Sequence, residues 1–242
     1  MKPLSDPHGV IRTSTRSAPW PRSARNRRMD WALLDRIEPI SRRFGYDRGG
    51  CIDRYYIERF LGEHAQDIRG HVLEIGEDRY TRQFGGDRVH RSDVVHVLDG
   101  NPKATLVGDL TDRKSIASDA FDCVILTQTL QHIYDIQAVV QTVYDLLNPD
   151  GVILCTVPGI SQISRYDMDR WGDYWRFTSL SLRRVWGDTF DPQSIKVEAF
   201  GNVMAAVAFL HGLAVEDVEA VKLDAHDPDY ELLLTVRACK TG

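Results

Sequence analysis

The sequence has few features of a membrane-embedded or secreted protein. No uninterrupted apolar run approaches the roughly 20 residues that a membrane-spanning helix needs, and no apolar core follows Lys2 as it would in a secretory signal. The four cysteines have no C-x-x-C spacing, which argues against a zinc site and against a disulfide framework. We therefore expect buried thiols in a reducing compartment, and hence a cytoplasmic protein.

Basic charge is concentrated at the amino terminus. Residues 1–28 carry seven basic side chains against Asp6 alone, although the whole chain has a net charge of −5. The segment is rich in Ser, Thr and Pro and has no apolar period, which is typical of a mobile arm. Contact with nucleic acid is one interpretation of such an arm. We favour a solvated tail, because the acidic remainder of the chain would repel phosphate.

Residues 29–70 predict an amino-terminal helical cap. Trp31, Leu34 and Ile37 have helical spacing, with Asp30 as a candidate cap and Gly45 beyond the end. A second helix is expected from Ile52 towards Gly70, after the glycine-containing stretch at residues 48–51.

Residues 71–242 alternate between strand and helix patterns, which predicts a doubly wound α/β sheet with helices on both faces. Several of the strands are short, continuous and β-branched, as expected for strands that are covered on both sides. The expected strands are 71–75, 88–91, 104–107, 121–126, 151–157, 195–200 and 232–238, and the clearest helices are 135–147, 179–188 and 202–214. The sequence contains no internal repeat.

Polar residues follow the first four expected strands. In a doubly wound sheet a ligand lies across the carboxyl ends of the strands, so these residues are expected to share one crevice. Asp93 lies 17 residues after Gly76, near the spacing at which an acid binds a ribose. Asp109 can accept from an adenine amino group while Leu110 packs on the ring.

This order of signals resembles the class I S-adenosylmethionine-dependent methyltransferases, which have a Rossmann-like, mostly parallel seven-stranded sheet. Their glycine-rich turn follows the pattern (D/E)-x-G-x-G-x-G, of which Glu74 and Gly76 match. Asp93 corresponds to the family's acid after the second strand, and Asp109-Leu110 to the pair after the third. The segments FDCVILTQTLQHI (121–133) and LLNPDG (146–151) resemble the fourth strand and the turn before the fifth.

A closer resemblance is to small stand-alone methyltransferases associated with glycan or specialised-metabolite assembly, through DRYYIE (53–58) and DYWRFT (173–178). The resemblance covers about residues 50–238 and implies S-adenosylmethionine as the cofactor. It implies a methyltransferase domain over residues 71–242.

The expected cofactor turn is crowded, since Asp78 and Tyr80 occupy the second and third glycine positions. The charged turn is nevertheless compatible with a zwitterionic ligand. Arg79 or Arg48 can pair with a carboxylate, and Glu74 or Asp78 with an ammonium group. The alternative is a scaffold that binds no cofactor. The predicted cofactor-binding residues are Glu74, Gly76, Arg79, Tyr80, Asp93, Asp109, Leu110 and Gln128.

The acceptor is expected beside the fourth strand and the segment RYDMDRWGDYWRFT (165–178). His132, Asp167 and Asp173 are the candidate catalytic groups, because a hydroxyl acceptor benefits from a base. Aromatic and polar groups suited to a flat acceptor give the predicted substrate-binding set, namely Tyr166, Trp171, Tyr174, Arg176 and His211. The aspartates of this segment set no coordination geometry, so no metal is predicted.

The sequence therefore predicts a cytoplasmic O-methyltransferase that modifies a small molecule or glycan, with an amine as the second choice of acceptor. Membrane contact is not expected, and a homodimer is left open. The alternative function is a non-catalytic, methyltransferase-like binding or assembly protein. A nicotinamide-dependent oxidoreductase is disfavoured because GEDRYT (76–81) lacks the G-x-G-x-x-G pattern.

Overall fold

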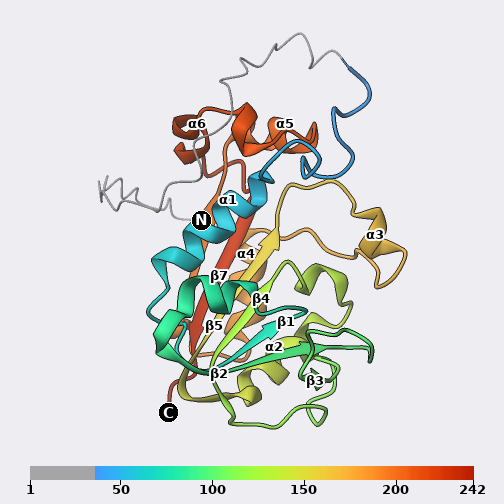
Figure 1. Ribbon diagram of the computed structural model, residues 1–242. Helices are drawn as coiled ribbons and strands as arrows, with labels where there is room; N and C mark the ends of the chain where they lie inside the picture. Colours follow the sequence, from blue (N-terminus) through green and yellow to red (C-terminus); the bar gives the residue numbers. More distant parts are fainter. Residues whose placement is uncertain (1–35) are drawn as a thin grey trace.

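The computed structural model describes residues 36–242, which form one seven-stranded sheet with helices on both faces (Figure 1). The strand order is β3-β2-β1-β4-β5-β7-β6, and β7 runs antiparallel to β5 and β6 while the remaining pairs are parallel. The strands are β1 (Gly70–Ile75), β2 (Val89–His96), β3 (Leu106–Val107), β4 (Phe121–Thr127), β5 (Leu147–Pro158), β6 (Ile195–Phe200) and β7 (Leu233–Cys239).

Polar side chains begin several of the helices by accepting hydrogen bonds from otherwise unpaired backbone N–H groups. Asp135 accepts from Ala138, Thr178 from Ser181, and Asn202 from Ala205. The α-helices are α1 (Ile52–Glu63), α2 (Ile136–Leu146), α3 (Arg165–Met168), α4 (Ser179–Gly187), α5 (Val203–Leu210) and α6 (Ala220–Asp224). Shorter π and 3-10 turns are η2 (Thr81–Gly85), η3 (Gly86–Arg88), η4 (Leu130–His132), η5 (Pro192–Ser194) and η6 (Val215–Asp217).

The core has two layers because successive side chains of a strand point to opposite faces of the sheet. Leu73 and its counterparts in β4 and β5 pack with α2 and α4, where Trp186 is fully buried. Val72 and the alternate residues pack with α1 and α5 around Tyr56 and Phe60. Both faces are therefore covered, as the continuous apolar strands predict.

The predicted fold class is confirmed, and each expected strand has a counterpart, although several bounds differ. Helix α1 ends at Glu63 and not near Gly70, β5 begins at Leu147 and not at Gly151, and α5 ends at Leu210 and not at residue 214. Strand β2 continues to His96, well beyond the expected end at Arg91. Residues 36–50 form turns and bends where a helix was expected to continue to Gly45. Pro39 disfavours a helix there, and the N–H groups of Ile40 and Ser41 instead donate to the carbonyl of His211. The basic arm and the start of the expected first helix, residues 1–35, lie outside the described residues.

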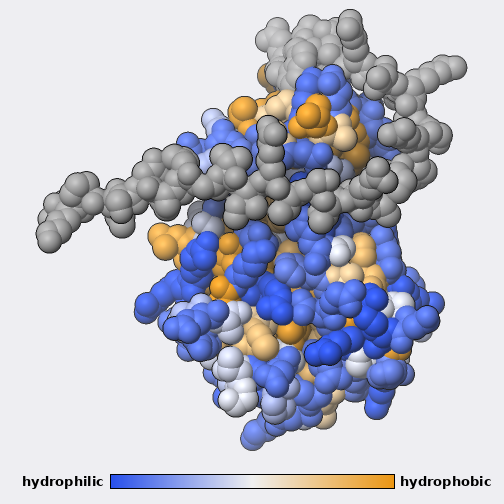
Figure 2. Space-filling view, turned by 90° about the vertical axis from the view of Figure 1, so that its left-hand side faces the viewer, coloured by the Kyte–Doolittle hydropathy of each residue, from blue (hydrophilic) through white to orange (hydrophobic). Residues whose placement is uncertain are grey.

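The surface is mainly polar. Figure 2 shows hydrophilic side chains over most of the described part of one face, with small separate hydrophobic patches between them. Within residues 36–242, no helix combines the length and the apolar character required to cross a bilayer.

Candidate functional site

A cleft of about 1050 Å³ opens at the carboxyl ends of the parallel strands. Its floor is formed by the ends of β1, β2 and β4 and by the residues that follow β3. Residues 42–54 and the loop of residues 161–176, which includes α3, supply the other lining residues, and the two segments meet where Nε2 of Gln162 donates to the carbonyl of Arg42 at 3.1 Å. The volume lies at the upper end of the range for small-molecule sites, which leaves room for two ligands.

The turn after β1 is anchored from below by Glu74. Its carboxylate is buried and accepts hydrogen bonds from the backbone N–H groups of Tyr80 and Thr81 and from the Thr81 hydroxyl, at 3.1, 2.8 and 2.8 Å. Burial raises the pKa of Glu74 to about 7 although these hydrogen bonds favour the charged form. Glu74 does not line the cleft, so the structure corrects its predicted role from ligand contact to support of the turn.

The crowded turn does not block the cleft. The Tyr80 ring is buried against the α1 side of the sheet and stacks on Phe84, with 6.2 Å between ring centroids. Arg79 forms an ion pair with Glu58 at 3.0 Å. Neither residue lines the cleft, contrary to the sequence prediction, because the chain turns away after Gly76. Gly76 itself lines it with φ +81°, and a Cβ added there would meet nothing within 4 Å.

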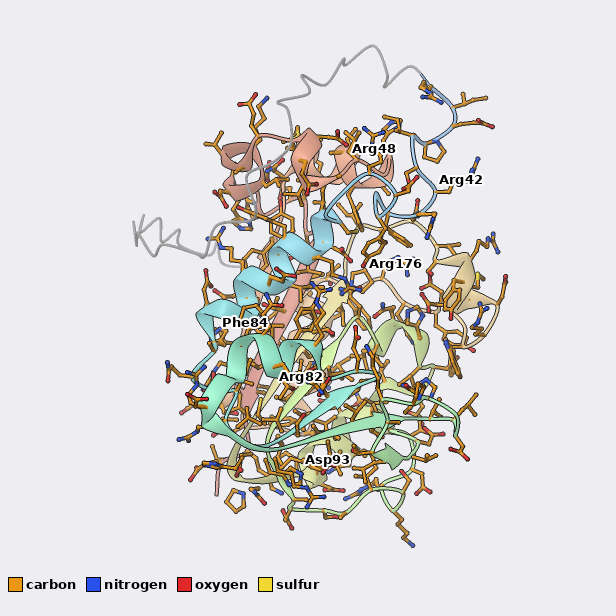
Figure 3. All side chains as sticks on the ribbon, in the orientation of Figure 1. Arg42, Arg48, Arg82, Phe84, Asp93 and Arg176 are labelled. Carbon is orange, nitrogen blue, oxygen red and sulfur yellow. The ribbon has the colours of Figure 1, made fainter. Side chains whose placement is uncertain are left out.

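Asp93 was expected at the end of the second strand and lies in its middle, paired in register with Leu73. Its carboxylate accepts from Thr105 and His71, both at 2.7 Å, and forms an ion pair with Arg91 at 3.0 Å. It is buried away from the cleft, as Figure 3 shows by its place low in the molecule beside β2, far from Arg176. The ribose role predicted for Asp93 is therefore wrong. The first acid beyond the end of β2 is Asp99, which is exposed.

Three of the predicted cofactor residues meet Gly76 in the cleft, namely Asp109, Leu110 and Gln128. Leu110 is almost fully buried and offers an apolar surface. Gln128 directly follows β4 with φ +47°, a conformation that costs a non-glycine residue energy and often marks a functional site. Its Nε2 is buried and has no hydrogen-bond partner within residues 36–242. An unpaired buried amide is unfavourable unless a ligand supplies an acceptor.

His132 is oriented by contacts at both ring nitrogens. Its Nδ1 lies 2.8 Å from the carbonyl oxygen of Gly172, which only accepts, so Nδ1 carries the proton and Nε2 is the acceptor in the neutral ring. Nε2 lies 3.2 Å from Nε2 of Gln131 and 3.9 Å from a carboxylate oxygen of Asp167. All three predicted catalytic residues line the cleft, and His132 and Asp167 lie close to each other.

Asp173, the third candidate catalytic residue, forms an ion pair with Arg176. The guanidinium donates to both carboxylate oxygens at 2.6 and 2.9 Å and also to the carbonyl oxygens of Ser161 and Gln162. Burial opposes ionisation, but the hydrogen bonds and charge of Arg176 lower the pKa of Asp173. A low pKa makes a weak base. We therefore assign Asp173 and Arg176 to holding the loop of residues 161–176 in place.

Aromatic side chains line the acceptor side of the cleft. Tyr166, Trp171 and Tyr174 contribute to its wall as expected, with Tyr134 beside Tyr174 at 5.5 Å between ring centroids. His211, the remaining predicted substrate residue, does not line the cleft. It follows α5, and its carbonyl oxygen holds the N-terminal segment through Ile40 and Ser41.

Asp53 and Arg54, at the start of α1, line the cleft and were not expected there. One carboxylate oxygen of Asp53 is buried without a hydrogen-bond partner in the described chain. Arg54 donates from Nε to the hydroxyl of Tyr46 at 2.8 Å. The sequence signal that could have identified these two residues was their position as a charged pair at the start of DRYYIE (53–58), beside the first buried turn of a helix. Arg48, the alternative carboxylate partner, instead forms an ion pair with Asp217 at 2.9 Å.

Comparison with known proteins agrees with this geometry. Residues 57–199, more than half of the chain, match the family model described as a methyltransferase domain. No curated protein matches the sequence.

Two solved structures are similar in fold. An S-adenosylmethionine-dependent methyltransferase from Archaeoglobus fulgidus has a TM-score of 0.51 at 13% identity, over 78% of this chain and 94% of its own. The [4+2]-cyclase SpnF has a TM-score of 0.51 at 13% identity, over 80% of this chain and 84% of its own. At such identities the likeness concerns the fold alone, and the chemistry must be argued from the site.

Proposed function

The chain belongs to the methyltransferase domain family, and we propose that it transfers the methyl group of S-adenosylmethionine to a hydroxyl of a small molecule. A glycan or specialised metabolite is the proposed source of that hydroxyl, with an amine as the second choice. The observation that carries the proposal is the convergence, in one wide cleft, of unpaired buried polar atoms with a histidine whose Nε2 is an acceptor.

The residues at the strand ends fit the cofactor. Gly76 leaves open space where a side chain would otherwise stand, and Leu110 offers an apolar surface for an adenine ring. Asp109 and the unpaired Nε2 of Gln128 supply polar partners for a nucleoside. When bound, S-adenosylmethionine supplies a methyl group on a positively charged sulfur, which is open to attack by a nucleophile.

Asp53 and Arg54 fit the amino-acid end of the cofactor. This end carries an ammonium and a carboxylate group, and the two side chains present the complementary charges from adjacent positions of α1. We assign the ammonium to the unpaired oxygen of Asp53 and the carboxylate to the fork of Arg54. This pair takes the place that the sequence prediction gave to Arg79, Arg48, Glu74 and Asp78.

His132 and Asp167 fit the proton transfer. Nε2 of His132 accepts the acceptor's proton, while the Gly172 carbonyl keeps the other ring nitrogen protonated. Asp167, 3.9 Å from Nε2, stabilises the ring in its charged form. Trp171 and Tyr174 exclude water from the acceptor and restrict its orientation, which raises the rate of an in-line displacement.

Calorimetric titration with S-adenosylhomocysteine tests the cofactor site. Asp53→Asn and Arg54→Gln are each expected to weaken binding by about tenfold or more, because hydrogen bonds to charged groups are worth about 1.5–3 kcal/mol. Arg59→Gln and Asp224→Asn are matched controls, since these residues form an exposed ion pair at 3.2 Å between α1 and α6. Both controls are expected to bind within about twofold of the wild type, given that such a pair contributes little.

Absence of heat at saturating S-adenosylhomocysteine, with a folded protein by circular dichroism, would overturn the proposal in favour of a non-catalytic scaffold. Equal losses in the cleft variants and their controls would overturn the assignment of Asp53 and Arg54. The cytoplasmic location expected from the cysteines stays a prediction.

A further inference from the structure

Four arginines surround the mouth of the cleft. Arg42 and Arg43 come from the N-terminal segment, and Arg165 and Arg170 come from the loop of residues 161–176. All four residues are exposed, and Figure 3 shows Arg42 above the level of Arg176. Two segments more than a hundred residues apart in sequence therefore place positive charge on the lining of one cleft.

The acids of the cleft do not neutralise this charge. Asp173 is paired with Arg176, and Asp53 lies beside Arg54 at the cofactor end. Asp109 accepts from the backbone and hydroxyl of Thr111, both at 2.8 Å. Only Asp167 remains among the lining acids of the acceptor side, against four arginines.

The sign of this charge is opposite to that of the protein. The chain has a net charge of −5, so the protein as a whole repels anions. The four arginines attract anions locally to this opening. Arg170 is held in place: its guanidinium lies 3.6 Å from the centroid of the Tyr166 ring, and Nη1 donates to the Tyr166 carbonyl at 2.7 Å. A guanidinium has five N–H donors, so most of those on Arg170 remain available for a ligand.

We propose that the methyl acceptor carries a phosphoryl group, bound at the mouth of the cleft by Arg42, Arg43, Arg165 and Arg170. The inference rests on the proposed methyltransferase function. A phosphate dianion has three acceptor oxygens and two charges, which matches several arginine forks better than a single carboxylate does. The aromatic wall of Trp171 and Tyr174 contacts the rest of the acceptor, which places its hydroxyl towards His132.

Titration with inorganic pyrophosphate, in the presence of saturating S-adenosylhomocysteine, tests this site. Arg42→Gln/Arg43→Gln and Arg165→Gln/Arg170→Gln are each expected to weaken pyrophosphate binding by about tenfold or more, since charge-assisted contacts to phosphate are lost. Arg184→Gln/Lys196→Gln is the matched control. It removes the same two charges at exposed positions that do not line the cleft, and is expected to leave pyrophosphate affinity within about twofold of the wild type.

The outcomes separate this inference from the proposed function. No binding of pyrophosphate, with normal binding of S-adenosylhomocysteine, overturns the phosphoryl site and leaves the methyltransferase proposal standing. Citrate binding as tightly as pyrophosphate, with the same sensitivity to the variants, overturns the choice of phosphate over carboxylate. A third outcome is that single-stranded RNA binds and pyrophosphate does not, and that the same variants weaken RNA binding. This result overturns a small acceptor in favour of nucleic acid.

Discussion

Glu74 links the stability of the fold to pH, in the direction opposite to that of most carboxylates. Its pKa in the folded protein is raised to about 7, against a reference of 4.5, by burial beneath the turn of residues 76–81. The folded state therefore binds the Glu74 proton more tightly than the unfolded chain does. Its contribution to stability is fully present below about pH 4.5 and is lost as the pH rises through about 7.

The magnitude follows from the difference between the two pKa values. At about 1.4 kcal/mol per unit, the whole change amounts to about 3 kcal/mol, of which about 2 kcal/mol falls between about pH 5 and pH 7.5. Other carboxylates titrate in the opposite sense, so the contribution of Glu74 has to be isolated by difference. Glu74→Gln keeps the shape of the side chain and removes the titration, at the cost of about one hydrogen bond to the turn.

Urea denaturation of the wild type and of Glu74→Gln at both pH values measures the effect. The wild type is expected to lose about 2 kcal/mol relative to the variant on going from the lower to the higher pH. The hydrogen bond that the variant lacks changes its free energy of unfolding by the same amount at both pH values, so this change cancels from the comparison. A difference between the two proteins that does not change with pH would refute the reasoning, because Glu74 would then be ionised throughout.

Four further substitutions test the assignment of roles. Asp93→Ala is expected to leave S-adenosylhomocysteine affinity within about twofold while lowering the free energy of unfolding by about 2 kcal/mol or more, as measured by calorimetry and urea denaturation; severe loss of affinity would restore its ribose role. Gly76→Ala places a Cβ in the cleft at positive φ, and is expected to weaken that affinity by about tenfold and stability by about 1 kcal/mol; unchanged affinity would move the cofactor elsewhere. Arg176→Ala leaves the carboxylate of Asp173 without its partner, and limited proteolysis is expected to cut the loop of residues 161–176 several times faster; an unchanged rate would show that other contacts hold the loop. His132→Gln is expected to lower turnover of a hydroxyl acceptor by about 100-fold or more at unchanged S-adenosylhomocysteine affinity; a small loss of turnover would remove the base from the mechanism.

Local patterns were sufficient for the elements of the sheet. The expected strands ending at Ile75, Leu126 and Val157 were predicted to within one residue of their carboxyl ends. Short apolar runs rich in β-branched residues and bounded by polar ones favour buried strands over helices. His132 was found for the same reason, since it lies in the short turn η4 that follows a strand whose end was clear. Its place in the cleft needed only the rule that ligands lie at the carboxyl ends of parallel strands.

The error at Asp93 has a physical cause that local patterns do not contain. The polar run at residues 90–93 looked like the end of a strand, but β2 continues because its backbone pairs with β1 up to Ile75 opposite Val95. The buried carboxylate is stabilised by His71 from β1 and by Thr105 just before β3. Partners from two other segments make burial of the charge acceptable, and the sequence around Asp93 does not reveal them.

The sequence by itself determined the alternation of strands and helices, and with it the edge of the sheet where a ligand binds. Only the tertiary structure decided which charges reach that edge. Asp53 and Arg54 face the cleft because α1 packs its apolar side on the sheet, whereas Arg79 pairs with Glu58 outside it. Apolar periodicity is a property of neighbours in the chain, but the partner of a charged side chain is set by whichever distant segment the packing brings within a few ångströms.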